Sequence, residues 1–433
     1  MSESHSALGA SGHRRDFLKT STAAVVGGAL AASLGSARMA HAEGSETLKV
    51  GLIGCGGRGS GAAVDACHAD KGAKLTVLAD LFPDRINGAK GSLAAALKDQ
   101  YAVTDDKCFS GFDAYKQVMA SDVDVVLLCT TPQFRPLHLK AAIEAGKHVF
   151  CEKPVAVDGA GVKSVMETAE EARKKKLNLV SGLCWRYDLG VRDTMKKVQD
   201  GAIGDVLTVQ SNYLTGTLWH RGRKPEWSEM EYQLRNWLYF TWLSGDHIVE
   251  QHIHSLDKAL WVMGDKLPKS CVGLGGRQVR NSADYGNVFD HFACCFEWEN
   301  GGKCFSYTRQ MKDCSTDVDD YVIGTKGKAV LLKHTVDGEG GKWEYKGPKP
   351  SMYLVEHQEL FASIRAGKVI NNGDYMCKST LMAILGREAC YTGKTLTADE
   401  VLNSPTVLGP KEMKFGDVPT PPVAMPGEPE KKA

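Results

Sequence analysis

One stretch of the chain, residues 48–80, limits the possible folds more than any other. The apolar run LKVGLIG (48–54) has the length of a buried strand, and the glycine-rich segment GCGGRG (54–59) and a helical sequence follow it directly. The next apolar run, KLTVLAD, ends on Asp80. This order predicts a strand, a tight turn, a helix and a second, parallel strand, so we expect an open parallel α/β sheet.

The glycine-rich segment and the end of the second strand predict a dinucleotide site. Glycines allow the backbone to approach a pyrophosphate at a helix N-terminus, and a carboxylate about twenty residues further on can hold ribose hydroxyls. Asp80 occupies that position, and its charge would repel a 2′-phosphate, which favours NAD. Arg58 and Arg85 leave NADP as an alternative. The predicted cofactor contacts in the loop are Gly54, Gly56, Gly57, Arg58 and Gly59.

Two later runs, VDVVLLCTTP (123–132) and KHVFCEKP (147–154), predict further buried strands. Ligands of open parallel sheets collect at the carboxyl ends of the strands, so polar residues there are expected to face the cofactor. A lysine at such an end, directly before a proline, is either a site residue or an exposed loop lysine. The residues at these two strand ends are Thr130, Thr131, Pro132, Glu152 and Lys153.

Composition restricts the partners of the chain. Its 433 residues are 43% apolar, which suffices for two domains with sizeable cores. The 53 basic residues nearly balance the 52 acidic ones, so no overall field attracts nucleic acid or anionic lipid. Apart from the N-terminus, no run approaches the roughly 18 apolar residues of a membrane-spanning helix. We expect a soluble protein that binds a small molecule, without nucleic-acid partners or stable membrane insertion.

The N-terminus, residues 1–42, has the features of an export signal. The segment HRRDFLK (13–19) precedes an Ala/Gly-rich apolar run and the small-x-small sequence AHA (40–42). This arrangement resembles a twin-arginine signal, although His13 stands where Ser or Thr is usual; the alternative is a tail with a chance Arg-Arg pair. The resemblance implies the twin-arginine export machinery as a partner and a periplasmic or otherwise exported location.

Cysteine usage predicts free thiols. The chain has 13 cysteines and no Cys-x-x-Cys pair, and several, such as Cys129 and Cys151, lie inside apolar strand-like runs. A disulfide framework is therefore not expected. The twin-arginine route carries proteins that have already folded in the reducing cytoplasm, so buried thiols are compatible with export.

Several motifs together resemble those of one enzyme family. The sequence AGKHVFCEKP, the upstream glycine motif, the TTP segment and the later HSLD resemble the Gfo/Idh/MocA family of NAD(P)-dependent sugar and inositol oxidoreductases, over residues 47–405. The resemblance implies an α/β fold with an N-terminal Rossmann domain (47–182) and a C-terminal α/β domain (183–405). The second domain is expected to contain a large, mostly antiparallel open sheet. One face of this sheet would line the active site and the other would support a homo-oligomer, a dimer or tetramer.

The second half of the chain is compatible with that plan. Asn300-Gly301 is a strong hairpin signal, and a Pro-rich tail, residues 418–433, is predicted to be disordered. The sequences HQELFASIRAG and KSTLMAILGREACYTG predict two helices that could pack back on the Rossmann domain. The predicted strands are 206–216, 269–280, 291–310 and 321–332.

The stretch GDHIVEQHIHSLD (245–257) is dense in ionisable groups. On a helix of about 100° per residue, five of them share one face while His252 points into the apolar side. Three interpretations stay open: a solvated helix face, acid–base chemistry, or a zinc site formed by three of these side chains. The five residues on the shared face are Asp246, His247, Glu250, His254 and Asp257.

The family resemblance implies acid–base roles. Members carry an Asp and, four residues later, a His that act with the motif lysine in proton transfer. His254 matches the histidine and Lys153 the lysine, whereas Glu250 stands at the Asp position, which is a departure. In this interpretation Lys153 hydrogen-bonds the reacting oxygen, His254 accepts its proton and Glu250 orients the imidazole. The family works without a metal, so none is predicted.

Substrate contacts are predicted at Arg186, Trp237 and His252. The basic position of Arg186 lies near the substrate in the family, but an ion pair linking the domains explains it as well. Trp237 belongs to an aromatic segment, residues 218–246, with four tryptophans. Such a segment suits stacking against sugar rings, and oligomer packing explains it equally.

The predicted activity is NAD(P)-dependent hydride transfer at a CH–OH group of a carbohydrate: a sugar, inositol or glycoside. Free NAD is scarce outside the cytoplasm, so an exported enzyme would keep its cofactor tightly bound and regenerate it in each cycle. A second sugar could take back the hydride. Alternatively, the enzyme is a redox-neutral NAD-dependent glycoside hydrolase or lyase that works through a keto-sugar. A third hypothesis is a non-catalytic nucleotide-containing binding protein, which the set Lys153, Glu250 and His254 disfavours.

Overall fold

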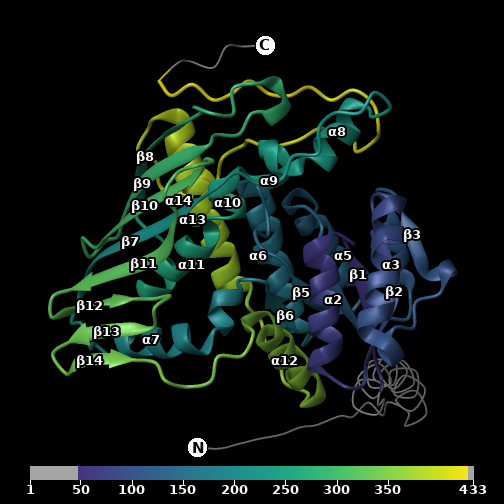
Figure 1. Cartoon of the computed structure of the whole chain (residues 1–433), viewed down its shortest axis with the longest axis horizontal. Helices are drawn as coiled ribbons and strands as arrows, with labels where there is room; N and C mark the ends of the chain where they lie inside the picture. Colours follow the sequence, from purple (N-terminus) through teal and green to yellow (C-terminus); the bar gives the residue numbers. More distant parts are fainter. Residues whose placement is uncertain (1–46, 428–433) are drawn as a thin grey trace, which may run out of the picture. The chain divides into compact units, whose positions relative to one another are not determined.

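Two β-sheets organise residues 47–427, the part of the chain that the computed structural model describes (Figure 1). The first sheet has six strands and the second has eight. The predicted export signal, residues 1–42, lies outside the described residues. Within the described range, no helix combines the length and apolarity needed to cross a bilayer.

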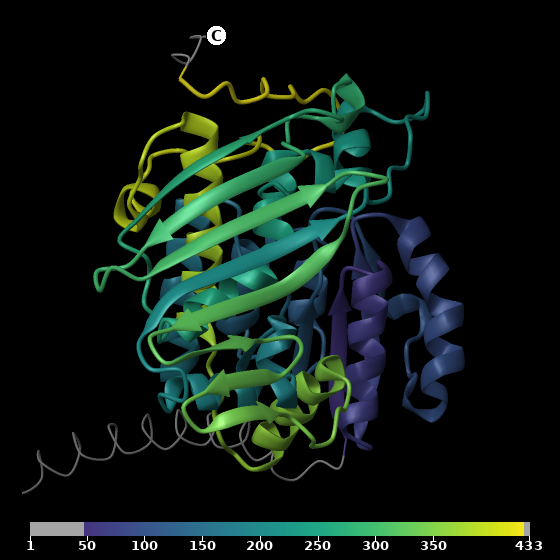
Figure 2. The same cartoon turned by 60° about the vertical axis from the view of Figure 1, so that its left-hand side comes forward.

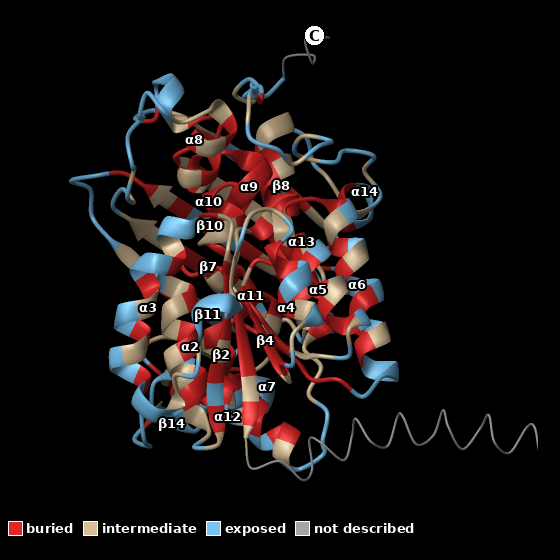
Figure 3. Cartoon of the chain, turned by 90° about the vertical axis from the view of Figure 1, so that its right-hand side faces the viewer, coloured by how far each residue is buried: buried red, intermediate tan, exposed pale blue. Residues whose placement is uncertain are grey.

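The first sheet is parallel in every pairing and has the order β3-β2-β1-β4-β5-β6. This is the strand order of a Rossmann fold, as predicted. Its strands carry near-continuous apolar runs because helices cover both faces, and Figure 3 shows β4 buried and β2 buried over most of its length. The strands are β1 (Leu48–Ile53), β2 (Ala73–Asp80), β3 (Cys108–Ser110), β4 (Val125–Leu128), β5 (His148–Cys151) and β6 (Leu179–Ser181).

The helices around this sheet include one from far along the chain. Helix α12 (Met352–Arg365) packs against α2, and its Leu360 and Phe361 belong to the same apolar core as β1. The C-terminal part thus packs back on the Rossmann sheet, while a domain boundary near residue 182 stays a prediction. The other helices here are α2 (Gly57–Ala69), α3 (Pro83–Leu97), α4 (Ala114–Ala120), α5 (Arg135–Glu144) and α6 (Gly159–Lys174).

The second sheet has the order β14-β13-β12-β11-β7-β10-β9-β8, and β7 with β10 is its one parallel pair. The mostly antiparallel sheet is therefore confirmed. The run 321–332 forms two antiparallel strands instead of one, because the chain turns at Thr325–Lys326. The strands are β7 (Val206–Thr215), β8 (Ser270–Gly276), β9 (His291–Glu297), β10 (Lys303–Gln310), β11 (Asp317–Gly324), β12 (Gly327–Val330), β13 (Thr335–Gly338) and β14 (Gly341–Glu344).

The two faces of this sheet differ. Helices α11 (Ile253–Val262) and α13 (Gly373–Thr392) cover one face, and burial alternates along β9 and β10. Figure 2 looks onto the other face, where no described helix lies over the long strands. We call this the open sheet face; its exposed apolar side chains are Val272, Leu274, Phe305, Tyr307 and Ile323.

Residues 245–257 do not form the single helix that their periodicity predicts. Helix α10 (His247–Glu250) ends before Gln251, and α11 starts at Ile253. The break has a tertiary cause, because Gln310 of β10 donates to the Gln251 side chain and Ser306 bonds His252. The five ionisable groups consequently do not share one face. The remaining helices are α7 (Leu189–Gln199), α8 (Glu229–Arg235), α9 (Thr241–Ser244) and α14 (Ala398–Leu402).

The C-terminal tail is ordered further than predicted. Residues 404–427, here called the C-terminal strap, run along one side of the molecule (Figure 1). Val418 is buried, and the Gln233 side chain donates to its carbonyl. The prediction of disorder is therefore wrong for 418–427, because packing compensates for the ordering of this Pro-rich stretch; residues 428–433 lie outside the described range.

Candidate active site

A cavity of about 500 Å³ lies at the carboxyl ends of the parallel strands. One side, here called the Rossmann wall, consists of the glycine loop and the ends of β2, β4 and β5. The opposite side, the C-terminal wall, consists of Trp219, Arg221, Leu234, Arg235, Trp237, Glu250 and His254. Sequence reasoning named Trp237, Glu250 and His254 of this set. The aromatic segment was the signal that could have identified four others. Tyr353 of α12 lines the cavity beside the glycine loop, with its ring centre 4.7 Å from the Arg58 guanidinium.

The glycines of the loop serve two physical purposes. A Cβ on Gly59 would lie 1.8 Å from the Gly54 carbonyl oxygen, and one on Gly54 would lie 2.6 Å from the backbone of Cys129. These two glycines therefore permit close packing of helix and strand. By contrast, a Cβ on Gly56 or Gly57 would meet no described atom within 4 Å. The loop is thus open where a pyrophosphate would approach the start of α2.

Two polar groups on the Rossmann wall suit a dinucleotide. The Asp80 carboxylate accepts hydrogen bonds from the backbone N–H groups of Cys55 (2.7 Å) and Phe82 (3.0 Å), which hold it at the cavity. Burial raises the pKa of Asp80. Thr131 Oγ1 is buried and has no hydrogen-bond partner among the described residues. Pro132 is buried and does not line the cavity, so its predicted contact with the cofactor does not fit.

Arg58 and Glu152 neutralise each other. The Arg58 guanidinium forms ion pairs with Glu152 and, at 2.7 Å, with Glu356 of α12. Burial opposes its charge, but the two carboxylates hold the pKa of Arg58 above its ordinary value. The pair ties the glycine loop to β5 and α12, and both side chains still line the cavity.

The three predicted acid–base residues meet in this cavity. Lys153 Nζ donates to Glu250 Oε1 at 3.0 Å and also to the Glu250 carbonyl. His254 Nδ1 is buried without a hydrogen-bond partner within residues 47–427. Burial, followed by the nearby charge of Lys153, holds the pKa of His254 well below its ordinary range, so the imidazole is neutral at neutral pH. Glu250 thus contacts Lys153 directly, whereas the orientation of His254 by Glu250 stays a prediction.

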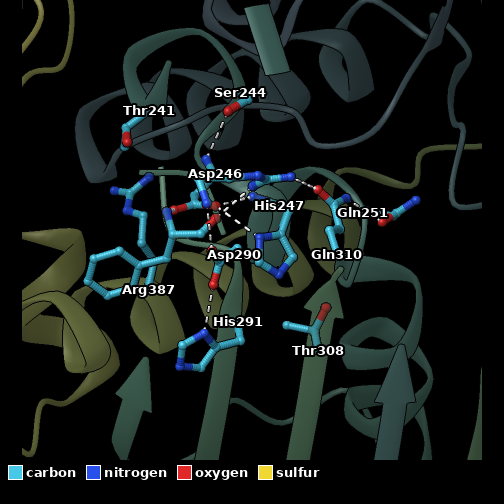
Figure 4. Close-up of polar contacts among 12 residues, drawn as sticks. Thr241, Ser244, Asp246, His247, Gln251, Asp290, His291, Thr308, Gln310 and Arg387 are labelled. Carbon is cyan, nitrogen blue, oxygen red and sulfur yellow. Dashed lines mark hydrogen bonds and ion pairs between the residues drawn. The ribbon is translucent and has the colours of Figure 1, made fainter. Parts of the chain in front are cut away.

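A buried polar network lies behind the C-terminal wall (Figure 4). Asp246, at the start of α10, accepts hydrogen bonds from the backbone N–H of Phe289 (2.7 Å) and the hydroxyl of Tyr391 (2.6 Å). The Arg387 guanidinium donates to the carbonyls of Val157 (2.7 Å) and Gly245 (3.2 Å). Because Val157 follows Lys153 by four residues and Gly245 precedes α10, Arg387 connects the two segments that carry Lys153 and Glu250.

His247 belongs to this buried network and does not line the cavity. Its Nδ1 lies 3.1 Å from Asp246 Oδ1. The three-residue zinc site considered from the sequence is therefore not assembled. Within the described part of the chain, no group of three or more His, Cys, Asp or Glu side chains is arranged to hold a metal ion.

Two predicted substrate contacts lie elsewhere. Arg186 is buried and forms ion pairs with Asp257 (2.8 Å) and Asp265 (2.6 Å). His252 is fully buried, and its Nε2 bonds Ser306 Oγ at 2.5 Å. Neither side chain lines the cavity, so neither is placed to contact a substrate there. Both are buried polar groups bonded to residues distant in sequence, and the ion pairs of Arg186 lie within residues 183–405 instead of linking the two predicted domains.

Comparison with known proteins decides the family. Residues 48–179 match the family model described as "Oxidoreductase family, NAD-binding Rossmann fold", and residues 191–330 match the "GFO/IDH/MocA C-terminal domain". The chain belongs to the Gfo/Idh/MocA family. It is an NAD-dependent oxidoreductase that acts on CH–OH groups.

Similar members of the Gfo/Idh/MocA family include two inositol dehydrogenases. Inositol 2-dehydrogenase 3 of Saccharopolyspora erythraea is 29% identical over 285 residues, which is 66% of this chain and 73% of that protein. Inositol 2-dehydrogenase of Rhizobium meliloti is 24% identical over 322 residues, 73% of this chain and 86% of that protein. Glycosyl hydrolase family 109 protein 1 of Bacteroides fragilis is 31% identical over 171 residues, 39% of this chain and 35% of that protein.

Solved structures confirm the fold class. Scyllo-inositol dehydrogenase from Lactobacillus casei has a TM-score of 0.63 at 21% identity, covering 82% of this chain and 99% of that one. Levoglucosan dehydrogenase, in complex with NADH and levoglucosan, has a TM-score of 0.64 at 17% identity, covering 81% and 99%. At these identities the comparison concerns the fold alone.

Proposed function

We propose that the protein oxidises a hydroxyl-bearing carbon of a sugar, an inositol or a glycoside with an NAD that stays bound between turnovers. The observation that carries this proposal is that Lys153, Glu250 and His254 share one cavity with a glycine loop open to a dinucleotide. The resemblance to inositol 2-dehydrogenases supports a cyclic polyol or sugar as the substrate class.

In this proposal each acid–base residue has one task. When bound, NAD supplies the acceptor for the hydride that leaves the carbinol carbon. Lys153 donates a hydrogen bond to the reacting oxygen, and Glu250 holds the Lys153 ammonium in place. His254 is neutral at neutral pH and accepts the hydroxyl proton. Burial and the charge of Lys153 disfavour the imidazolium, so the proton that His254 accepts is released to bulk water as the carbonyl product forms.

We assign cofactor binding to the glycine loop, Asp80 and Thr131. Gly56 and Gly57 leave room for the pyrophosphate, Asp80 faces the ribose hydroxyls, and the Thr131 hydroxyl is free to bond the ligand. Arg58 and Glu152 act indirectly, by holding the loop against β5.

Export and assembly are part of the proposal. The sequence of residues 1–42 supports export by the twin-arginine machinery to the periplasm, with the cofactor bound before export. The open sheet face supports a homo-oligomer, because several large apolar side chains gather there, among them Leu274 at 77% exposure. Sedimentation of the wild type and of Leu274→Asp tests this assembly: the variant is expected to form smaller particles, and an unchanged size would contradict the use of this face.

A second candidate is a redox-neutral glycoside hydrolase or lyase. The 31% identity to a glycosyl hydrolase family 109 protein over 171 residues favours it. In that reaction a sugar hydroxyl is oxidised, the adjacent C–H loses its proton, the glycosidic group leaves, water adds and the hydride returns. Exchange of the hydrogen next to the keto carbon with solvent deuterium would distinguish it from plain oxidation. Glycoside cleavage without such exchange or a keto intermediate would exclude this route.

The test of resident cofactor uses protein exported from its own or a comparable host. After extensive dialysis the protein is denatured, and the released nucleotide is identified by mass spectrometry. We expect stoichiometric NAD(H). An empty site with weak affinity would contradict residence, and turnover unaffected by Lys153→Ala would contradict the catalytic role assigned to Lys153.

A further inference from the structure

One end of the cavity is covered by the aromatic segment (218–246), which the proposed chemistry does not use. Five residues of this segment line the cavity together with the end of β2: Trp219, Arg221, Leu234, Arg235 and Trp237. The acid–base residues belong to other elements, α10, α11 and the loop after β5. The aromatic segment therefore has a separate binding task.

Arg235 fixes the segment above the β2–α3 turn. Its guanidinium lies 3.9 Å from the centre of the Phe82 ring and forms an ion pair with Asp84 at 3.0 Å. Phe82 follows Asp80 by two residues, so the segment is anchored next to the carboxylate that faces the ribose hydroxyls. The cavity end beneath it is the end for the adenosine half of a dinucleotide.

Trp219 and Arg221 are the two side chains at this end of the cavity that are available to a ligand. Trp219 is 41% exposed, and the Arg221 guanidinium lies 4.7 Å from the centre of its indole. No described carboxylate lies within ion-pair distance of Arg221, and burial together with the neighbouring Arg85 and Arg235 lowers its pKa. An exposed indole beside a guanidinium without a carboxylate partner presents two flat surfaces suited to an aromatic base.

We infer that Trp219 and Arg221 bind the adenine base of the cofactor, so that the C-terminal wall clamps the adenosine half of NAD. This assignment replaces sugar stacking for Trp219, because the charged groups near its partner Arg221 are Asp84, Arg85 and Arg235 and not the Lys153–Glu250 pair. The inference rests on the proposed function, because it assumes that NAD stays bound between turnovers.

The C-terminal strap braces the clamp from outside. The Phe415 ring packs against Phe82 at 6.1 Å and Phe112 at 5.2 Å between ring centres. Gly416 exchanges hydrogen bonds with the start of α8, donating to Ser228 Oγ and accepting from the Met230 N–H at 3.0 Å. Three segments that are distant in sequence thus enclose the adenosine end, which explains how a single chain retains its cofactor.

The first test measures cofactor exchange. Holoenzymes of the wild type, Trp219→Ala and Arg221→Ala are mixed with excess 1,N6-etheno-NAD, and its binding is followed by fluorescence as bound NAD leaves. We expect about tenfold faster exchange in each variant, since loss of one stacking partner weakens base binding by this order. The matched control is Arg223→Ala: Arg223 pairs with Glu229 at 2.7 Å and does not line the cavity. Equal rates in all four proteins would overturn the clamp.

A second measurement separates the clamp from residence of the cofactor. ADP-ribose and nicotinamide mononucleotide are titrated into nucleotide-free protein by calorimetry. The Kd for ADP-ribose should rise about tenfold in Trp219→Ala and Arg221→Ala, while that for the mononucleotide stays unchanged. If the wild type exchanges NAD rapidly, residence is wrong but this comparison still decides the clamp. Equal weakening of both half-ligands would show a general structural defect and overturn it.

Discussion

The two walls of the cavity are built in different ways. The Rossmann wall comes from strand ends and a glycine loop that follow one another in the sequence, and backbone groups hold its key carboxylate, Asp80. The C-terminal wall comes from an irregular segment and several helices, and a buried network that includes Asp246 and Arg387 holds the start of α10. The first wall is therefore set by local sequence, whereas the second, which carries Glu250, His254 and the inferred adenosine clamp, depends on tertiary contacts for its position.

The largest expected effect comes from the contact between the walls. Lys153→Ala removes the hydrogen bond to Glu250 and the donor to the reacting oxygen, so kcat should fall about a thousandfold, the scale of acid–base catalysis. Bound nucleotide, measured after dialysis, should stay stoichiometric because the glycine loop is unchanged. A parallel loss of nucleotide would mean that Lys153 also holds the cofactor.

The Rossmann wall can be probed by two glycines that differ in their surroundings. Gly59→Ala places a Cβ against the Gly54 carbonyl and should lower the free energy of unfolding by about 3 kcal/mol, as severe overpacking does. Gly57→Ala meets open space and should leave the melting temperature nearly unchanged while reducing NAD affinity. Thermal unfolding measures the melting temperatures of both variants, and calorimetry measures the NAD affinity of Gly57→Ala. Equal melting temperatures would contradict the packing role of Gly59.

A buried histidine behind the Rossmann wall should contribute to acid sensitivity. His357 of α12 is fully buried, has no hydrogen-bond partner for either ring nitrogen among the described residues, and burial lowers its pKa to about 3. Between that value and about 6.5 the unfolded chain binds a proton that the folded protein lacks, so stability falls as the pH drops through this range. His357→Phe should remove a penalty of about 2 kcal/mol at pH 5.

Denaturant unfolding of His357→Phe at pH 8 and pH 5 measures this gain. The exposed His68 offers the control His68→Phe, which should not change the difference between the two pH values. An acid stability of His357→Phe equal to that of the wild type would show that this histidine relaxes to accept its proton.

The smallest effect is expected from Arg387, which connects the segments that carry Lys153 and Glu250. Arg387→Met leaves the Val157 and Gly245 carbonyls without their donor, so Lys153 and Glu250 lose their relative alignment. We expect kcat to fall about tenfold with KM and nucleotide content unchanged, and Arg387→Lys to restore part of the rate. Steady-state kinetics on the folded variants measure kcat and KM separately. A change confined to thermal stability would make Arg387 a purely structural residue.

The predictions from sequence held where local pattern determines structure. The runs ending at Asp80, Thr130 and Glu152 became parallel strands, and the motif lysine came to the cavity because it directly follows β5. They failed where a polar residue had several possible partners. The sequence predicts substrate contacts at Arg186 and His252, but Asp257 and Ser306, distant in sequence, bond them in the core, and His252 Nδ1 has no described partner.

By itself, the sequence determined the Rossmann sheet, the open glycine loop and the position of Lys153, because strand length, turn chemistry and the residue at a strand end are local properties of the chain. Only the tertiary structure decided the break between α10 and α11 and the pairing of Glu250 with Lys153. It also decided the packing of 418–427 and the closure of the adenosine end by the aromatic segment. These features depend on hydrogen bonds and ring contacts between residues up to hundreds of positions apart, which local periodicity does not encode.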